Sequence, residues 1–309
     1  MPFSTGRVCL PFFCCALFAQ QIPRAPDGRP DLQGIWNNAT LTPVERPAFF
    51  AGKATATDEE ARVYEKRDLR HENEDKASAA VGGLDSEFTE LRLELVRVGG
   101  VKHTSLIVDP PDGKVPALTP EASGRLAQRR RTAGGTDTAQ QRPLAERCLL
   151  SLANSGGPPM MPAPQNANYQ IVQTADAIMI MVEMVHDVRI IRIGGAHPPS
   201  NVRFWLGDSI GHWEGDTLVA DTTNFREDTN FRGASGNLHV IERFTRLDGN
   251  SIFYKVTVDD PTTFTKNWTM EFPLISEPGP IYEYACHEGN YAMIDILTAA
   301  RKADAAQNR

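Results

Sequence analysis

From residue 168 to residue 289 the chain is a succession of short β-type segments, with no stretch long enough for crossover helices between them. Runs rich in Val, Ile, Tyr, Phe and Thr predict strands. Asp-Gly at 248–249 and Glu-Gly-Asp at 214–216 are typical of hairpin turns. Strands joined in this way pair antiparallel. The eight predicted strands are NYQIVQT, AIMIMVEMVHD, VRIIRI, TLVADTTNF, LHVIERFTRL, SIFYKVTVDD, NWTMEFPLI and IYEYACHEG.

This pattern predicts a mainly β fold for residues 166–309, an antiparallel eight-stranded barrel or sandwich with a C-terminal helix over 291–306 that packs on the outside. Residues 20–165 form an irregular, partly helical N-terminal portion that packs on the barrel. There we expect one strand at Leu32–Trp36 and helices from Thr57 to about residue 77, over 86–98, and after the capping residue Thr119.

The first residues differ from the rest. Arg7 precedes an apolar run from Val8 to Ala19, and a polar stretch follows. This order is typical of a secretory signal peptide, residues 1–19, cleaved after Ala19, and it predicts a secreted or periplasmic protein. A misassigned start or an unstructured tail is the other interpretation.

The cysteines agree with export. Three of the five lie inside the predicted signal peptide, which leaves Cys148 and Cys286. An even remainder in an exported chain predicts one disulfide between them. Two unrelated buried thiols are the alternative.

Charge and length exclude two classes of protein. A net charge of −7 argues against a nucleic-acid partner, which would need a basic surface. No apolar stretch reaches the roughly 18 residues of a membrane-spanning helix, so we expect no integral membrane segment. With 309 residues, 41% of them hydrophobic, the chain can form a sizeable core. The oligomeric state is left open.

Several motifs carry a resemblance: PDLQGIW, TLTPVERP, SLIVDPPDGK, HWEGDTLVADTTNF, TNFRG, ERF, TVDDPTTFTKNWT and YEYACHEGNY. They resemble those of a large family of uncharacterised exported bacterial proteins, over most of the mature chain; residues 80–100 depart from the pattern. The resemblance implies secretion or periplasmic residence and brings no reaction. Separately, Gly34-x-Trp36 ahead of a multi-stranded barrel is similar to the first strand of lipocalins.

Polar residues within the strands are the first candidates for a site. On 238–246, Val240, Glu242 and Phe244 share one face, and His239 and Arg243 lie on the other. Both faces are therefore mixed, and a solvated exterior alone does not explain this. We expect some of these polar groups to line a cavity or its mouth, because an unpaired buried polar group costs about 1–3 kcal/mol.

Two further clusters stand out. In CHEGN, His287 and Glu288 follow Cys286, and His287 is suited to proton transfer near neutral pH; a structural cap at a strand end is the alternative. We expect this cluster at the rim of the main cavity, near Asp221 or Asn224. In EMVHDVRI, alternation favours an exposed ladder of ion pairs that includes Arg189.

No motif identifies a cofactor. Histidines at 186, 197, 212, 239 and 287 have no metal-binding spacing, so no metal site is predicted, although dispersed strands could assemble one. Phosphate-binding glycine loops and G-x-S-x-G are absent, and GDSIG at 207–211 is interpreted as a loop.

Two classes of function follow. The first is an exported small-molecule enzyme of hydrolase, lyase or isomerase type, with acid–base residues at the barrel mouth. The second is a non-catalytic, lipocalin-like carrier of an apolar small ligand, which would need an apolar cup. The catalytic candidates are His287, Glu288, Asp221 and His239, and the ligand-binding candidates are Asn224, Glu242, Arg243, Tyr284 and Asn290.

Overall fold

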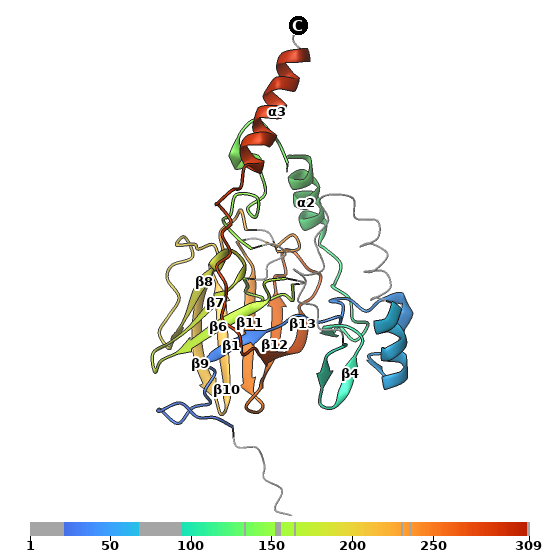
Figure 1. The fold of residues 1–309 in the computed structure, drawn as a ribbon, viewed down its shortest axis with the longest axis vertical. Coiled ribbons are helices and arrows are strands. Elements are labelled where there is room, and N and C mark those ends of the chain that lie inside the picture. The colour runs from blue at the N-terminus through green and yellow to red at the C-terminus, as the bar shows by residue number, and fades with distance from the viewer. Residues whose placement is uncertain are drawn as a thin grey trace, which may run out of the picture.

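The computed structural model describes residues 22–67, 94–132, 134–151, 156–163, 165–229, 231–234 and 236–307. A β-barrel forms the body of the molecule, a small sheet and helices lie beside it, and one helix projects from one end (Figure 1). The barrel strands are β1 (Gly34–Asn37), β6 (Asn168–Gln173), β7 (Ala177–Val182), β8 (Val188–Ile193), β9 (Asp208–Glu214), β10 (Thr217–Thr223), β11 (His239–Arg246), β12 (Ser251–Asp259) and β13 (Trp268–Ser276).

The barrel prediction is confirmed, with nine strands among the described residues rather than eight. They follow the order β1-β6-β7-β8-β9-β10-β11-β12-β13, and β13 pairs again with β1 to close the barrel. Strand β1, which comes from the N-terminal portion, is antiparallel to both of its neighbours. Closure leaves none of these nine strands as a free edge.

Two expectations about the strands are wrong. The pair β8 and β9 is parallel, through Ile191–Ile193 and Ser209–Gly211, whereas every neighbouring pair was expected to be antiparallel. The segment interpreted as a loop at 207–211 belongs mostly to β9, which starts at Asp208. The long connection 194–207 carries the chain back along β8, and only this return makes a parallel pair possible.

Alternation along the strands separates a packed interior from a polar exterior. On β11 and β12 every second side chain is buried, as the sequence pattern predicted. The inward-facing side chains of Phe244, Tyr254 and Phe272 have no surface accessible to water, and their rings pack in a row.

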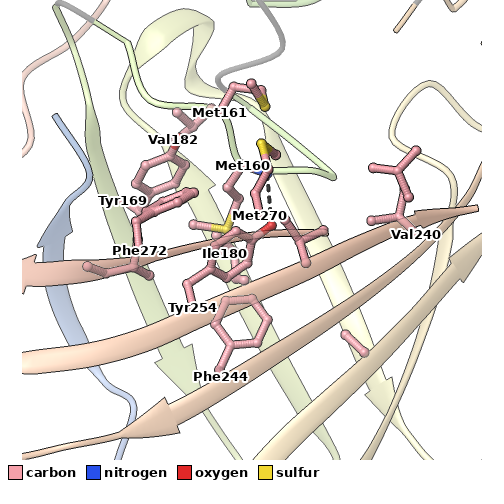
Figure 2. Packing of buried hydrophobic residues seen from close by; sticks show 14 of the residues in the cluster. Met160, Met161, Tyr169, Ile180, Val182, Val240, Phe244, Tyr254, Met270 and Phe272 are labelled. Atoms are coloured by element: carbon pink, nitrogen blue, oxygen red, sulfur yellow. Dashed lines mark hydrogen bonds between the residues drawn. The ribbon is translucent and has the colours of Figure 1, made fainter. Parts of the chain in front are cut away.

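A strap formed by residues 156–163 lies over the interior. Its Met160 and Met161 are buried above Tyr254 (Figure 2), and the backbone N–H of Met160 donates to the Tyr254 hydroxyl at 3.0 Å. Methionine suits such a position because its flexible thioether fills irregular gaps. The strap therefore helps to close this part of the barrel.

The N-terminal portion contributes both to the barrel and to a separate layer. The short strand β5 (Ile107–Asp109) pairs with β13, beside the barrel closure. A small sheet, in the order β2-β4-β3, packs with the helical residues 58–67 at the side of the barrel (Figure 1). The other elements are η1 (Ala48–Phe50), β2 (Thr55–Ala56), β3 (Arg97–Val98), β4 (Val101–His103), α2 (Pro120–Thr132), η3 (Ala139–Gln141) and η5 (Met184–His186).

Helix predictions in this portion have mixed outcomes. The Thr57–Glu60 capping box is present, with the Glu60 backbone N–H donating to the Thr57 hydroxyl at 3.2 Å. Thr119 likewise caps α2. The helix expected over 86–98 is wrong at its end, where Arg97–Val98 forms β3, and residues 86–93 lie outside the described residues. The predicted signal peptide and residues 68–77 also lie outside them.

At the C-terminal end, two expectations need correction. Residues 281–290 are irregular, so IYEYACHEG is not a strand. Helix α3 (Ala292–Gln307) is present as predicted, but it buries none of its residues and projects from the barrel (Figure 1). The sulfurs of Cys148 and Cys286 lie 1.94 Å apart, at bonding distance, which confirms their predicted pairing. None of the described helices is both long and apolar enough to span a bilayer.

Candidate functional site

The parallel seam of the barrel carries a pocket of about 440 Å³. β8 and β9 are paired over only three residues each, Ile191–Ile193 with Ser209–Gly211, so Val188–Ile190 of β8 are not paired with β9. Residues 187–190 form one wall of the pocket and residues 204–207 form the other. The pocket thus exists because a parallel pair, unlike a hairpin, is not held together by a short turn at this end.

The walls of this pocket include several exposed apolar side chains. Val188 is 47% exposed, Ile190 is 48% exposed and Phe204 is 44% exposed, and Leu149 and Trp205 lie beside them. The Arg226 guanidinium stacks on the Trp205 ring, 4.2 Å from its centroid. Clustered exposed apolar side chains in a concavity mark binding sites for small molecules.

Charged side chains form a continuous hydrogen-bonded chain that starts at the pocket rim. The Arg192 guanidinium donates to both carboxylate oxygens of Asp208, at 2.6 and 3.0 Å, and both residues line the pocket. Nδ1 of His197 is 2.7 Å from Asp208 Oδ2, and Nε2 of His197 is 3.0 Å from Asp221 Oδ1. Nε2 of His239 is 2.8 Å from Asp221 Oδ2. We call these five residues the Asp–His chain.

The Asp–His chain crosses the outer face of four strands. Arg192, Asp208, Asp221 and His239 are outward positions of β8, β9, β10 and β11, opposite buried neighbours in each strand. His197 comes from the connection between β8 and β9. Antiparallel registry sets Asp221 opposite Ile241 on β11, so His239 is its diagonal neighbour. Regular strand alternation is therefore sufficient to bring these groups together.

Hydrogen bonds within the Asp–His chain favour the charged forms of Asp208, Asp221 and His239. The hydrogen bond from His239 lowers the pKa of Asp221, and the same bond raises the pKa of His239. Burial alone would raise the pKa of Asp208, but hydrogen bonds from Arg192 and His197 outweigh it and the pKa is lowered. Ionised carboxylates only accept hydrogen bonds. Each of the two ring nitrogens of His197 bonds to one of these carboxylates.

Asn224 fixes the connection that bears His197. Its side-chain amide donates to the Pro198 carbonyl at 3.0 Å, and its own carbonyl accepts from the Phe204 backbone N–H at 2.9 Å. Asn224 has a φ of 58°, a left-handed conformation that Asn tolerates better than most residues. One residue thus ties both the His197 loop and the Phe204 wall of the pocket to the end of β10.

One residue of the pocket lining, Arg189, which we call the floor of the pocket, forms an ion pair inside the barrel. Arg189 lines the pocket and is 5% exposed, and its two terminal nitrogens donate to the Glu242 carboxylate at 2.6 and 2.7 Å. The Tyr254 hydroxyl also donates to Glu242, at 2.8 Å. The expected exposed ladder of ion pairs at residues 183–189 is wrong, because Arg189 points inward and pairs across the barrel.

The structure brings together some of the sequence candidates and separates others. Asp221, His239 and Asn224 are neighbours on the outer surface. Glu242 is on the opposite face of β11 from His239, as alternation predicted, and it faces the interior. Arg243 is on the outer face and pairs with Glu214, in an exposed ion pair.

The CHEGN cluster belongs to a different segment from the residues of the Asp–His chain. His287 and Glu288 are exposed in the irregular segment just before α3. The Asn290 side chain lies against Cys148, with its amide nitrogen 3.7 Å from the sulfur. Tyr284 is partly buried and packs against the main core. No hydrogen bond of the described part of the chain joins His287 or Glu288 to the Asp–His chain.

Sequence reasoning missed His197, Asp208, Arg192 and Arg189 as site residues. His197 follows Gly194-Gly195 in a segment without strand periodicity, and Asp208 begins a strand that was interpreted as a loop. The sequence did contain one signal for this site: Asp208 is an acidic residue directly before a segment, 209–214, whose side chains alternate between the two faces of a strand. Arg189 and Glu242 are 53 residues apart and no local pattern links them.

The described side chains offer no cluster suited to a metal ion. Within residues 22–307, as far as they are described, no group of three or more His, Cys, Asp and Glu side chains is placed to hold a metal ion. Both nitrogens of His197 already bond to carboxylates, which leaves neither for a metal.

Comparison with protein-family models, with curated proteins and with solved structures finds no match to this chain. The candidate site therefore has to be interpreted from its own geometry.

Proposed function

We propose that this protein is an exported enzyme that performs acid–base chemistry, of hydrolase, lyase or isomerase type, on a small molecule bound in the pocket at the β8–β9 seam. The observation that carries the proposal is the Asp–His chain that begins at the pocket rim. The volume of the pocket, about 440 Å³, is in the range of small-molecule sites, which is roughly 300–1,000 Å³.

The roles follow from position. Asp208 lines the pocket, so its carboxylate is the group of the chain that a bound molecule would meet together with Arg192. His197 is the proton-transfer group at the pocket end of the Asp–His chain, because it bonds directly to Asp208. Asp221 and His239 act through His197 as positioning residues, since they hold its ring and set the local charge. General acid–base groups contribute about 10²–10⁴ in rate.

Export is part of the proposal and has its own support. The N-terminal charge and hydropathy pattern is typical of a signal peptide. The pairing of Cys148 with Cys286 fits an oxidising compartment, where disulfides persist.

A carrier with its ligand inside the barrel has less support. A lipocalin-like cup needs space between the inward-facing side chains, whereas Phe244, Tyr254 and Phe272 are fully buried and their rings pack against one another. The external pocket is the better place for a ligand.

Turnover measurements test the proposal. Purified mature protein is screened against esters, lactones, hydroxy acids and enolisable ketones, and His197→Gln is compared with the wild type. We expect turnover of at least one class and a loss of about 10²-fold or more in kcat/KM in His197→Gln.

The matched control is His212→Gln. His212 also bonds to a carboxylate on the outer face of β9, that of Glu214 at 3.1 Å, but it belongs to neither the pocket nor the Asp–His chain. Its kcat/KM should equal that of the wild type. Failure of every class to turn over, or equal turnover in folded His197→Gln, would reject the enzyme.

A further inference from the structure

The floor of the pocket carries an unusual donor. Arg189 bonds to Glu242 end-on, through its two terminal nitrogens, and this geometry leaves the Nε–H edge of the guanidinium unused. Nε of Arg189 is buried and has no hydrogen-bond partner in the described part of the chain. Buried polar groups are almost always hydrogen-bonded, so each exception requires an explanation.

We infer that the pocket selects small molecules with an apolar ring or chain and one carbonyl-type oxygen, which accepts the hydrogen bond from Nε of Arg189. The inference rests on the pocket assigned in the proposed function and specifies what that pocket takes. The walls supply the apolar contact, through Val188, Ile190 and Phe204, and Arg189 supplies the one donor at the floor.

Both arginines of the pocket lining are already paired with carboxylates. The positive charge of Arg189 is balanced by Glu242 behind it, and that of Arg192 is balanced by Asp208 at the rim. The other carboxylate of the pocket lining, that of Asp187, accepts a hydrogen bond from the Ser151 backbone N–H at 3.3 Å. An oxygen acceptor can bond to Nε without breaking either pair, because Nε is not used in them.

Access to Nε requires a movement of the wall. The atom is covered in the structure, and the wall beside it contains Val188 and Ile190. Their side chains are about half exposed, at 47% and 48%, so a change of rotamer there loses few packing contacts.

A matched set of probes tests the inference by protein NMR, with the Trp205 indole signal as the reporter of the pocket. Acetophenone carries the ring and a neutral carbonyl, benzoate carries the ring and a carboxylate, and ethylbenzene carries only the ring. We expect acetophenone or benzoate to bind about tenfold or more tightly than ethylbenzene, and the comparison of the first two shows whether the pocket prefers a neutral or an ionised acceptor.

Two substitutions locate the binding. Val188→Trp fills the pocket from an exposed position, and we expect it to weaken acetophenone binding by at least about tenfold. Val101→Trp is the matched control, because Val101 is also 48% exposed but lies on β4, in the small sheet; its binding should match the wild type. Arg189→Lys keeps a cation for Glu242 and removes Nε–H, so the preference over ethylbenzene should disappear in this variant if it folds.

The outcomes separate the two proposals. Equal affinity for acetophenone, benzoate and ethylbenzene, or no binding of any of them, overturns the inference, and this result does not depend on how Arg189→Lys folds. Selective binding of oxygen-bearing probes that Val188→Trp abolishes supports it, even when the turnover comparison of His197→Gln with the wild type rejects the enzyme.

Discussion

At the scale of single residues, the Asp–His chain shows how exposed groups acquire defined charge states. Asp221 has one oxygen bonded to His197 and the other bonded to His239. Its side chain is 39% exposed, so solvent screens these interactions, and geometry rather than burial holds the groups together. A carboxylate in this position orients two imidazole rings at once.

The first prediction concerns His239. Asp221→Asn removes the charge partner that raises the pKa of His239, so this pKa should fall in the variant, as followed by an NMR pH titration of the ring protons. Because the folded-state pKa is raised above the ordinary 6.5, the stabilisation is fully present below pH 6.5 and is lost as pH rises through the folded value.

The signals of His212 in the same spectra are the internal control, since that ring bonds to Glu214 and not to Asp221. Identical His239 titrations in the two proteins would show that the hydrogen bond does not form in solution.

At the scale of elements, one ion pair ties two strands together across the barrel. Arg189 on β8 and Glu242 on β11 are not strand neighbours, yet they pair inside, with side chains 3% and 0% exposed. A buried pair adds little stability relative to apolar residues, but the loss of one partner leaves an uncompensated buried charge. The pair thus specifies how β8 faces β11.

Glu242→Gln should therefore lower the free energy of unfolding by about 3–5 kcal/mol in urea denaturation. Arg243→Gln is the control: it changes the next residue on β11, whose ion pair with Glu214 is exposed, and it should cost less than about 1 kcal/mol. Similar small losses in both variants would contradict a buried, charge-paired Arg189.

At the scale of the whole molecule, the cysteine pair joins segments that strand pairing does not connect. Cys148 lies next to Leu149 of the pocket wall, and Cys286 lies in the irregular chain before α3, 138 residues away. Helix α3 buries none of its residues, and the covalent link acts together with the packing of Tyr284 against the main core to hold the chain before α3 near the barrel.

Removal of the link should lower global stability. In the double variant Cys148→Ser, Cys286→Ser we expect the free energy of unfolding to fall by about 2–5 kcal/mol, because a long loop is no longer closed in the unfolded chain. Wild-type protein treated with a dithiol reductant should match the variant. Thiol titration of unfolded, unreduced mature protein should detect no free thiols, and two would refute the bond.

Local sequence periodicity was sufficient to predict most of the barrel. β11 and β12 alternate buried and exposed side chains, and this two-residue period is a direct consequence of strand geometry. The separation of His239 from Glu242 follows from the same rule. The pairing of Cys148 with Cys286 could be predicted as well, because exclusion of the other cysteines left one combination.

Tertiary structure alone decided the seam and the site that depends on it. Whether β8 pairs with β9 in parallel is set by the path of residues 194–207, and no periodic pattern within either strand encodes that path. The same return places His197 between two carboxylates and separates the walls of the pocket. Arg189 and Glu242 meet only because the closed barrel puts β8 opposite β11. Side-chain alternation is a local property and is visible in the sequence, whereas contacts across a barrel depend on closure, which only the complete set of strands determines.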